Sequence, residues 1–151
     1  MKKIIYLLFI LKFITASGTF ADEINIASDK LNVDRDKNIS IFSGNVYASN
    51  DNLEIWSEKL TVKSNRENKE INEIIAESNV KIVKDEMTVL GDKGLYFPET
   101  NKLNVIGNIQ VNNNGNIIHC DELTVDLEES ISIMKSTSSN RVEAVIVLED
   151  S

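Results

Sequence analysis

Apolar side chains recur at every second position along most of the chain. Pairs such as Leu60/Val62 and Leu103/Val105 have polar residues between and around them. Because successive side chains of a strand point to opposite faces, this period of two predicts β-strands with one apolar face and almost no helix. Clusters rich in Asn, Asp and Glu lie between the apolar runs and predict turns. The sequence therefore indicates an all-β protein.

A five-residue phrase repeats along the chain. It reads DKLNV at 29–33, EKLTV at 58–62 and DELTV at 121–125, with a weaker copy, DKGLY, at 92–96. The acids that open the phrase are separated by 29, 34 and 29 residues. Repeats of this length are typical of stacked supersecondary units, none of which buries its apolar face alone.

A second phrase, built on a Gly-Asn or Ser-Asn pair, alternates with the first. It reads SGNV at 43–46, ESNV at 77–80 and IGNI at 106–109. Across its first copy the apolar positions change from odd numbers, Ile39 and Ile41, to even numbers, Val46 and Ala48. We therefore expect a β-bulge or corner at Gly-Asn that turns the strand and returns its apolar residues to the inner face.

The repeated acids Asp29, Glu58, Asp92 and Asp121 have two interpretations. Glycan hydrolysis would require two carboxylates in unlike environments, one of them kept protonated. The sequence offers no nucleophile elbow and no phosphate loop, and its single His leaves few candidates for a general base. A carboxylate that recurs in every repeat is more simply a solvent-facing residue at the start of a strand, so we expect no enzyme and no catalytic residue.

Cys120, the only cysteine, lies in the trio HCD at 119–121. Adjacent side chains of a strand point to opposite faces, so His and Cys of this trio cannot bind one metal ion together. Cys120 also occupies the place that Ser28, Ser57 and Gly91 hold in the other copies. We expect a small residue that fills space, with no metal site and no cofactor.

The first 21 residues differ from the rest of the chain. A positively charged start precedes an apolar run from Ile4 to Leu11, and a small-x-small ending, TFA, closes the segment. This arrangement is typical of a cleavable secretory signal, and the run is short and broken by Lys12. We expect residues 1–21 to be a signal peptide that is cleaved after Ala21, and residues 22–151 to form one exported domain.

The charge balance of the chain is acidic. There are 16 Lys and Arg against 24 Asp and Glu, and the predicted signal contains three Lys and no acid. The mature chain therefore keeps 13 basic and 24 acidic residues, a net charge of −11. Such a surface repels phosphate groups, which argues against binding to nucleic acid or to an anionic membrane surface.

Five phrases follow the predicted signal in a fixed order. They are SDKLNVDRDKNISIFSGNVYA, LEIWSEKLTVK, IIAESNVKIV, GDKGLYFPETNKLNVIGNIQV and CDELTVDLEESIS. Together they span about residues 24–148 and resemble the LptA/OstA-like family of periplasmic lipopolysaccharide-transport proteins. The resemblance implies an open-edged β-jellyroll of about sixteen short antiparallel strands in the periplasm, whose apolar interior holds the acyl chains of lipid A.

The resemblance and the alternation together predict which residues line that interior. The predicted lipid-binding residues are Ile39, Ile41, Val46, Leu53, Ile55, Leu60, Val62, Val80, Ile82, Val89, Leu95, Phe97, Leu103, Val105, Ile109, Val111, Leu123 and Val125. Each buried methylene contributes about 0.8 kcal/mol, so a fourteen-carbon acyl chain in free water would cost on the order of 10 kcal/mol. A lined interior removes that barrier.

The two ends of the sheet are expected to bind protein partners. The C-terminal stretch RVEAVIVLED is apolar on both faces, and no charge or proline interrupts it from Val145 to Leu148. It either pairs inside its own sheet or stays bare so that another domain adds a strand. The predicted edge residues are Ile24, Ile26, Leu31 and Val33 at one end and Val142, Ala144, Ile146 and Leu148 at the other.

The resemblance implies an LptC-like partner at the inner membrane and an LptD-like partner at the outer membrane. A head-to-tail oligomer of the chain itself is a further option. Three rival interpretations stay open: an LptC-like subunit that keeps an N-terminal membrane helix, the N-terminal part of an LptD-like protein, and a β-solenoid adhesin or glycan-binding protein. The short, Lys-broken apolar run and the chain end at Ser151 argue against the first two.

Overall fold

The computed structural model describes residues 23–137 and 139–148, so the predicted signal peptide, residues 1–21, lies outside the described part. Among the described residues no helix is long and apolar enough to cross a membrane. All strand pairs are antiparallel. The strands are β1 (Asn25–Ala27), β2 (Lys30–Asp34), β3 (Ile39–Ser49), β4 (Glu54–Ser64), β5 (Ile71–Lys84), β6 (Met87–Phe97), β7 (Lys102–Asn113), β8 (Asn116–Asp126), β9 (Ile131–Lys135) and β10 (Glu143–Val145).

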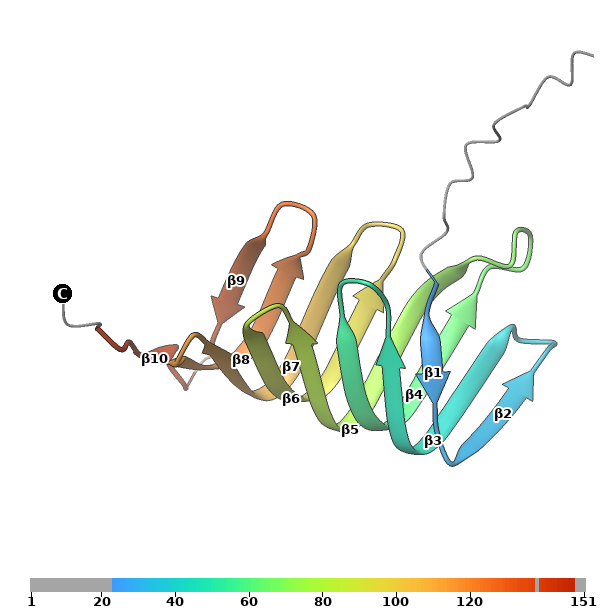
Figure 1. Ribbon diagram of the computed structural model, residues 1–151, viewed down its shortest axis with the longest axis horizontal. Coiled ribbons are helices and arrows are strands. Elements are labelled where there is room, and N and C mark those ends of the chain that lie inside the picture. The colour runs from blue at the N-terminus through green and yellow to red at the C-terminus, as the bar shows by residue number, and fades with distance from the viewer. Residues whose placement is uncertain (1–22, 138, 149–151) are drawn as a thin grey trace, which may run out of the picture.

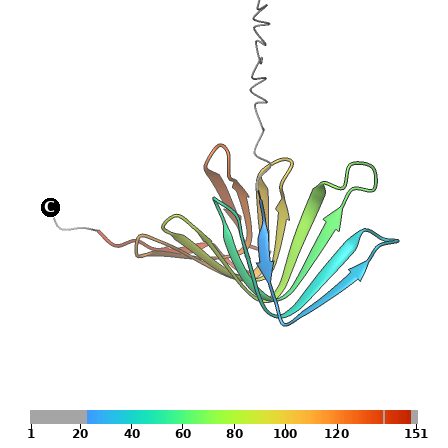
Figure 2. The same ribbon diagram turned by 45° about the vertical axis from the view of Figure 1, so that its right-hand side comes forward.

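The strands form one meander in which each long strand, β3 to β8, pairs with the next along the chain. Each long strand bends near its middle, so the sheet folds into a V with two arms (Figures 1 and 2). The predicted β-jellyroll is confirmed, with ten continuous strands. This is fewer than the expected sixteen, because each of the six long strands passes through a corner as one continuous strand.

The short strands complete the two ends of the sheet. At one end β2 and β1 pair with the two halves of β3, and at the other end β9 and β10 pair with the two halves of β8. We name the arm that ends in β2 and β9 the first arm, and the arm that ends in β1 and β10 the second arm. Both arms therefore end in a short strand whose outer edge is unpaired within the described chain.

The core lies between the inner faces of the two arms. Residues of both arms belong to one buried cluster. The arms approach closely because small residues lie where they meet: a Cβ added to Gly94 of the first arm would lie 3.3 Å from Ile82 Cδ1 of the second arm. The buried apolar residues are Val46, Ala48, Leu53, Ile55, Leu60, Val62, Ile74, Ala76, Val80, Ile82, Val89, Tyr96, Leu103, Val105, Ile109, Val111, Cys120, Leu123 and Val125.

Two unbroken cross-strand rows of apolar or small residues form this core. Directly opposed residues of neighbouring strands share a face, so each row can be followed from strand to strand. The first-arm row is Leu31, Phe42, Leu60, Ala76, Gly94, Val105, Leu123 and Met134. The second-arm row is Ile26, Ala48, Ile55, Ile82, Val89, Val111, Ile118 and Ala144. Both rows run the whole length of the sheet.

The predicted change of face at Gly-Asn is wrong in its position. Phe42, Val46 and Ala48 of β3 are all even-numbered and all contact the core, so β3 keeps its parity through the bulge. The parity changes in the neighbouring strand instead, from Ile55 before Glu58 to Leu60 after it. At the bulge, Gly44 and Asn45 of β3 oppose the single residue Glu58 of β4. Because β4 has one residue fewer than β3 across the corner, its inner residues change from odd to even numbers.

Four residues predicted to line the interior lie on the outer face. Ile41 is paired with Thr61, and Ile39 with Lys63, whereas the buried Leu60 and Val62 point the other way. In β6 the inner residue is the buried Tyr96, so its neighbours Leu95 and Phe97 point outward. The prediction failed because both parities are apolar in these segments, and only the pairing register decides between them.

Candidate functional site

Three corners of the sheet are each closed by a hydrogen bond between the two repeated phrases. At the first corner Gly44 and Asn45 both have positive φ angles, of 81° and 46°, and Asn45 Nδ2 donates to Asp29 Oδ2 at 3.0 Å. Asn suits this place because it tolerates the left-handed region better than most residues and carries an amide donor. Equivalent bonds join Asn79 to Glu58 at 2.7 Å and Asn108 to Asp92 at 2.9 Å. We call these pairs the corner clasps.

The length of the acidic side chain in each clasp is complementary to the size of the residue that precedes the Asn. At Gly44 a Cβ would lie 2.6 Å from Asp29 Oδ2, and at Gly107 it would collide with Asp92. The middle corner has Ser78, with φ of 69°, in the place of the glycine, and its acid is the longer Glu58. A longer side chain can reach the Asn amide from farther away, which leaves room for the Ser side chain.

The fourth repeated acid, Asp121, binds a different partner set. It accepts hydrogen bonds from the Thr137 backbone N at 2.8 Å, from Thr137 Oγ1 at 3.1 Å and from Asn140 Nδ2 at 3.3 Å. These bonds, the backbone one foremost, lower the pKa of Asp121. These bonds tie Thr137 and Asn140 onto β8, and we call them the Asp121 clasp.

The repeated acids are thus corner residues, and the prediction that they start strands is wrong for three of the four. Glu58, Asp92 and Asp121 lie inside β4, β6 and β8, and Asp29 lies between β1 and β2. Each carboxylate binds a neighbouring Asn side chain. Their recurrence follows from the need to close a bend in every repeat.

His119 and Cys120 point to opposite faces of β8, as their spacing predicts. His119 is exposed, whereas Cys120 is buried against the core, where burial first and the Asp121 charge second raise the pKa of its thiol. Cys120 lies beside its corner, as Ser57 and Gly91 do in the other repeats. Large side chains do not fit at these positions: a Cβ on Gly91 would lie 2.6 Å from Val105. Within the described ranges no group of three potential ligands could hold a metal.

The interior between the arms is filled in this structure. Fourteen of the eighteen predicted lining residues are buried in the core; the exceptions are Ile39, Ile41, Leu95 and Phe97. Near the arm tips, Ile24, Leu53 and Tyr96 border a gap of only about 10 Å³, roughly enough for one water molecule. The two arms therefore bury each other's apolar faces, and an acyl chain would have to part them.

Sequence reasoning missed Phe42 and Tyr96 as inner residues. Phe42 packs against the core and belongs to the first-arm row, and Tyr96 is 5% exposed. A signal did exist for Phe42, because it lies two residues from the Gly-Asn bulge at the same parity as Val46. Nothing in the local pattern of GLYF distinguishes Tyr96 from its apolar neighbours.

The N-terminal end of the sheet leaves apolar residues in contact with solvent. Leu31 and Val33 of β2 are 53% and 52% exposed, although they continue the inner face of the first arm. Ile24 and Ile26 of the second arm are partly buried against the core. The four predicted edge residues are therefore grouped at one end of the interior.

The C-terminal stretch pairs in part with its own sheet, the first of the two alternatives that the sequence left open. Residues 143–145 pair with β8 through only three positions, and their other edge is free of partners in the described chain. Ile146 and Leu148 continue past the last pair and are 66% and 85% exposed. This segment is thus anchored in its own sheet and still presents an apolar, open edge, with Val142 and Ala144 also exposed.

Comparisons with known proteins agree with this architecture. A family model described as "LptA/(LptD N-terminal domain) LPS transport protein" matches residues 25–131. The chain belongs to this family. Its predicted membership is thereby confirmed, and LptA-like proteins are transport proteins. No curated protein sequence matches the chain.

A solved structure shows the same fold. It is the crystal structure of LptH, described as the LptA homologous periplasmic component of the conserved lipopolysaccharide transport device from Pseudomonas aeruginosa. The TM-score is 0.74, and the match covers 84% of this chain and 96% of that chain. With 16% sequence identity, the likeness establishes the LptA-like jellyroll and leaves the ligand to be argued from this chain.

Proposed function

We propose that this protein is a periplasmic carrier that shields the acyl chains of lipopolysaccharide between its two arms. The observation that carries the proposal is the pair of unbroken apolar rows, one on each arm, that run from one end of the sheet to the other. Membership of a lipopolysaccharide-transport family supports this ligand. The fourteen buried lining residues, together with Phe42 and Tyr96, are the proposed acyl contacts.

The chemistry of the closed interior suits a reversible opening. The buried side chains between the arms are apolar apart from Ser57 and Tyr96, so the arms are held mainly by hydrophobic contact. Hydrophobic contact is non-directional, and an acyl chain can replace one arm as the partner of the other. A fourteen-carbon chain regains on the order of 10 kcal/mol when it leaves water, which offsets the separation of the arms.

The two ends of the sheet are proposed to join the carrier to its neighbours. Leu31 at one end and Ala144 at the other are the last members of the two apolar rows, and both are exposed. Strand addition at β2 or β10 would continue a row into a neighbouring jellyroll without a break. The proposed neighbours are an LptC-like protein, an LptD-like protein or a second copy of this chain. Cleavage after Ala21 and export of residues 22–151 belong to the same proposal.

The test is capture of lipopolysaccharide by the purified mature chain. Protein and lipopolysaccharide micelles are mixed and separated by size, and lipid bound per protein is measured beside an acidic protein of similar size. We expect saturable binding that a long-chain fatty acid competes for. A folded chain that binds no more lipopolysaccharide than the acidic control would overturn the proposal. Recovery of residues 1–21 in a membrane-bound form would favour the LptC-like alternative.

A further inference from the structure

A cleft opens between the tips of the two arms near the N-terminal end of the sheet. It has a volume of about 440 Å³. Its rim carries side-chain amides from both arms, with Asn50 in the β3–β4 turn of the second arm and Asn65 in the β4–β5 turn of the first. Ile24, Ile71 and Tyr96 form its apolar floor. The cleft is therefore amphipathic, with a polar rim above apolar side chains.

The floor of this cleft leads to the core. Ile24, Asn50 and Tyr96 line the cleft and also border the gap of about 10 Å³ beneath it. The remaining wall of that gap consists mainly of inner residues of the second arm, including Leu53 and Ile55. Ile24 and Tyr96 therefore lie between the cleft and the apolar interior.

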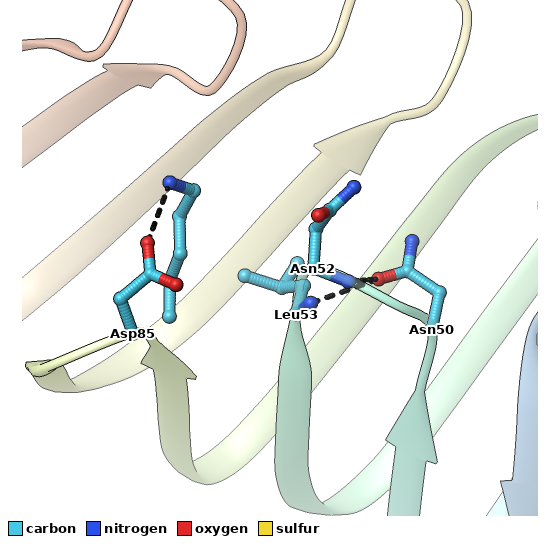
Figure 3. Close-up of polar contacts among 5 residues, drawn as sticks. Asn50, Asn52, Leu53 and Asp85 are labelled. Atoms are coloured by element: carbon cyan, nitrogen blue, oxygen red, sulfur yellow. Dashed lines mark hydrogen bonds and ion pairs between the residues drawn. The ribbon is translucent and has the colours of Figure 1, made fainter.

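The rim amides are held in place by their own turns. Asn50 Oδ1 accepts hydrogen bonds from the backbone N of Asn52 at 3.0 Å and of Leu53 at 2.8 Å (Figure 3). Asn65 Oδ1 accepts from the backbone N of Glu67 at 2.9 Å. Because the oxygens are occupied, both side chains keep a fixed –NH₂ group, and none of the described residues accepts a bond from it. The rim thus presents two positioned hydrogen-bond donors.

The charges of the cleft restrict what these donors bind. The charged residues that line it are Glu70 and Glu99, and no Lys or Arg lines it. Glu70 accepts a bond from Asn68 Nδ2 at 2.7 Å. Carboxylates without a cation disfavour phosphate, whereas an uncharged carbonyl or hydroxyl oxygen is a suitable acceptor.

We propose that this cleft is a side port, which binds the uncharged junction where an acyl chain joins the sugar of a glycolipid. The ester or amide carbonyls and nearby hydroxyls accept from Asn50 and Asn65, and the acyl chain passes between Ile24 and Tyr96 into the interior. The phosphates of the glycolipid stay outside the cleft. This port rests on the proposed carrier function and adds the site and chemistry of loading.

The strand next to the port is weakly attached, which suits a gate. Ile24 directly precedes β1, which pairs with β3 through only three residues. The long strands, in contrast, are paired through nine or more positions. Displacing β1 with Ile24 would widen the gap beneath the cleft and leave the long strands and corner clasps intact.

The experiment compares Asn50→Asp and Asn65→Asp with Asn112→Asp in the mature chain. Each change keeps the Oδ1 acceptor that its turn needs, replaces the –NH₂ donor and adds one negative charge. Asn112 accepts from the Gly115 backbone N at 3.2 Å and does not line the cleft, so it is the matched control. Binding is measured with purified lipopolysaccharide and, separately, with a fluorescent long-chain fatty acid at pH 7.

We expect N50D and N65D each to bind lipopolysaccharide about tenfold more weakly than N112D, which carries the same added charge, because each loses one uncharged donor of the cleft. A photo-crosslinker at Ile71 should capture the lipid, and one at Ile131 of the outer face should not. Equal lipopolysaccharide binding by N50D, N65D and N112D, with no crosslink at Ile71, would overturn the port. Absence of binding by the unmodified chain would instead overturn the carrier function itself.

Discussion

Asn108 Nδ2 donates a hydrogen bond to Asp92 Oδ2 at 2.9 Å and closes the corner where β6 and β7 bend together. The two residues are 16 positions apart and belong to different repeated phrases. The same relationship joins Asn45 to Asp29. Two sequence patterns that look unrelated along the chain are therefore the two halves of one structural device.

The corner glycine should be intolerant of a side chain. Gly107→Ala introduces a Cβ both at a positive φ of 85° and into the position of the Asp92 carboxylate. We expect a loss of about 2–4 kcal/mol in the free energy of unfolding, measured by urea denaturation. Gly115→Ala is the matched control, because its φ is 83° and its nearest contact is 3.9 Å away. It should lose only about 1–2 kcal/mol, and equal losses would argue against the collision.

A second substitution should rescue the corner. The natural pair of Glu58 and Ser78 shows that a longer acid accompanies a Ser at this place. We expect Gly107→Ser to destabilise the protein and Asp92→Glu to recover part of that loss in the double variant. The coupling free energy comes from a double-mutant cycle of unfolding measurements. If the unfolding free-energy changes of the two single variants are strictly additive, the effect of the Ser does not depend on the length of the acidic side chain.

The residues that contact lipid should be those that the structure places on the inner face of the sheet. Photo-crosslinkers at Phe42, Leu60 and Val105 should capture lipopolysaccharide, and those at Ile41 and Thr61 should not, because the latter two share the outer face. Crosslinked lipid is detected as a mobility shift and by immunoblotting. Capture at Ile41 comparable to that at Phe42 would contradict a single lined face.

Removal of the C-terminal edge should separate assembly from folding. Truncation after Asn140 keeps the bond to Asp121 and deletes β10, whose three residues are all exposed. We expect the free energy of unfolding to change by about 1 kcal/mol or less, since few contacts are lost. Lipopolysaccharide binding should persist, and bridging to a partner domain should be lost. An unfolded truncated protein, seen by circular dichroism, would place the segment in the core.

The Asp121 clasp should weaken in acid. The bonds from Thr137 and Asn140 lower the pKa of the Asp121 carboxyl in the folded state. Its contribution to stability is therefore complete above the ordinary Asp pKa and is lost as the pH falls toward the lowered value. The protection factor of the Thr137 amide against hydrogen exchange should fall over that window, and Asn140→Ala should move the Asp121 pKa, followed by NMR, upward. An unchanged pKa in N140A would exclude the side-chain bond as a contributor.

The strands and the repeat could be predicted from the sequence because both depend on local pattern. The alternation around Leu60, Leu103 and Leu123 follows from the period of a strand, and all three are buried. The bulge at Gly-Asn follows from the residues that tolerate positive φ, and Gly44 and Asn45 confirm it. Membership of the transport family followed from the order of the phrases along the chain.

Only the tertiary structure decided which face is inside, which residues close the corners and how the arms meet. Ile41 and Phe42 are equally apolar neighbours, and the pairing of β3 with β4 alone places Phe42 inside and Ile41 outside. The partnership of Asn108 with Asp92 depends on two strands lying side by side. Burial between the arms likewise depends on contacts across the V, which no local pattern contains. A one-residue change of register reverses every side chain of a strand, so these outcomes belong to the assembled sheet.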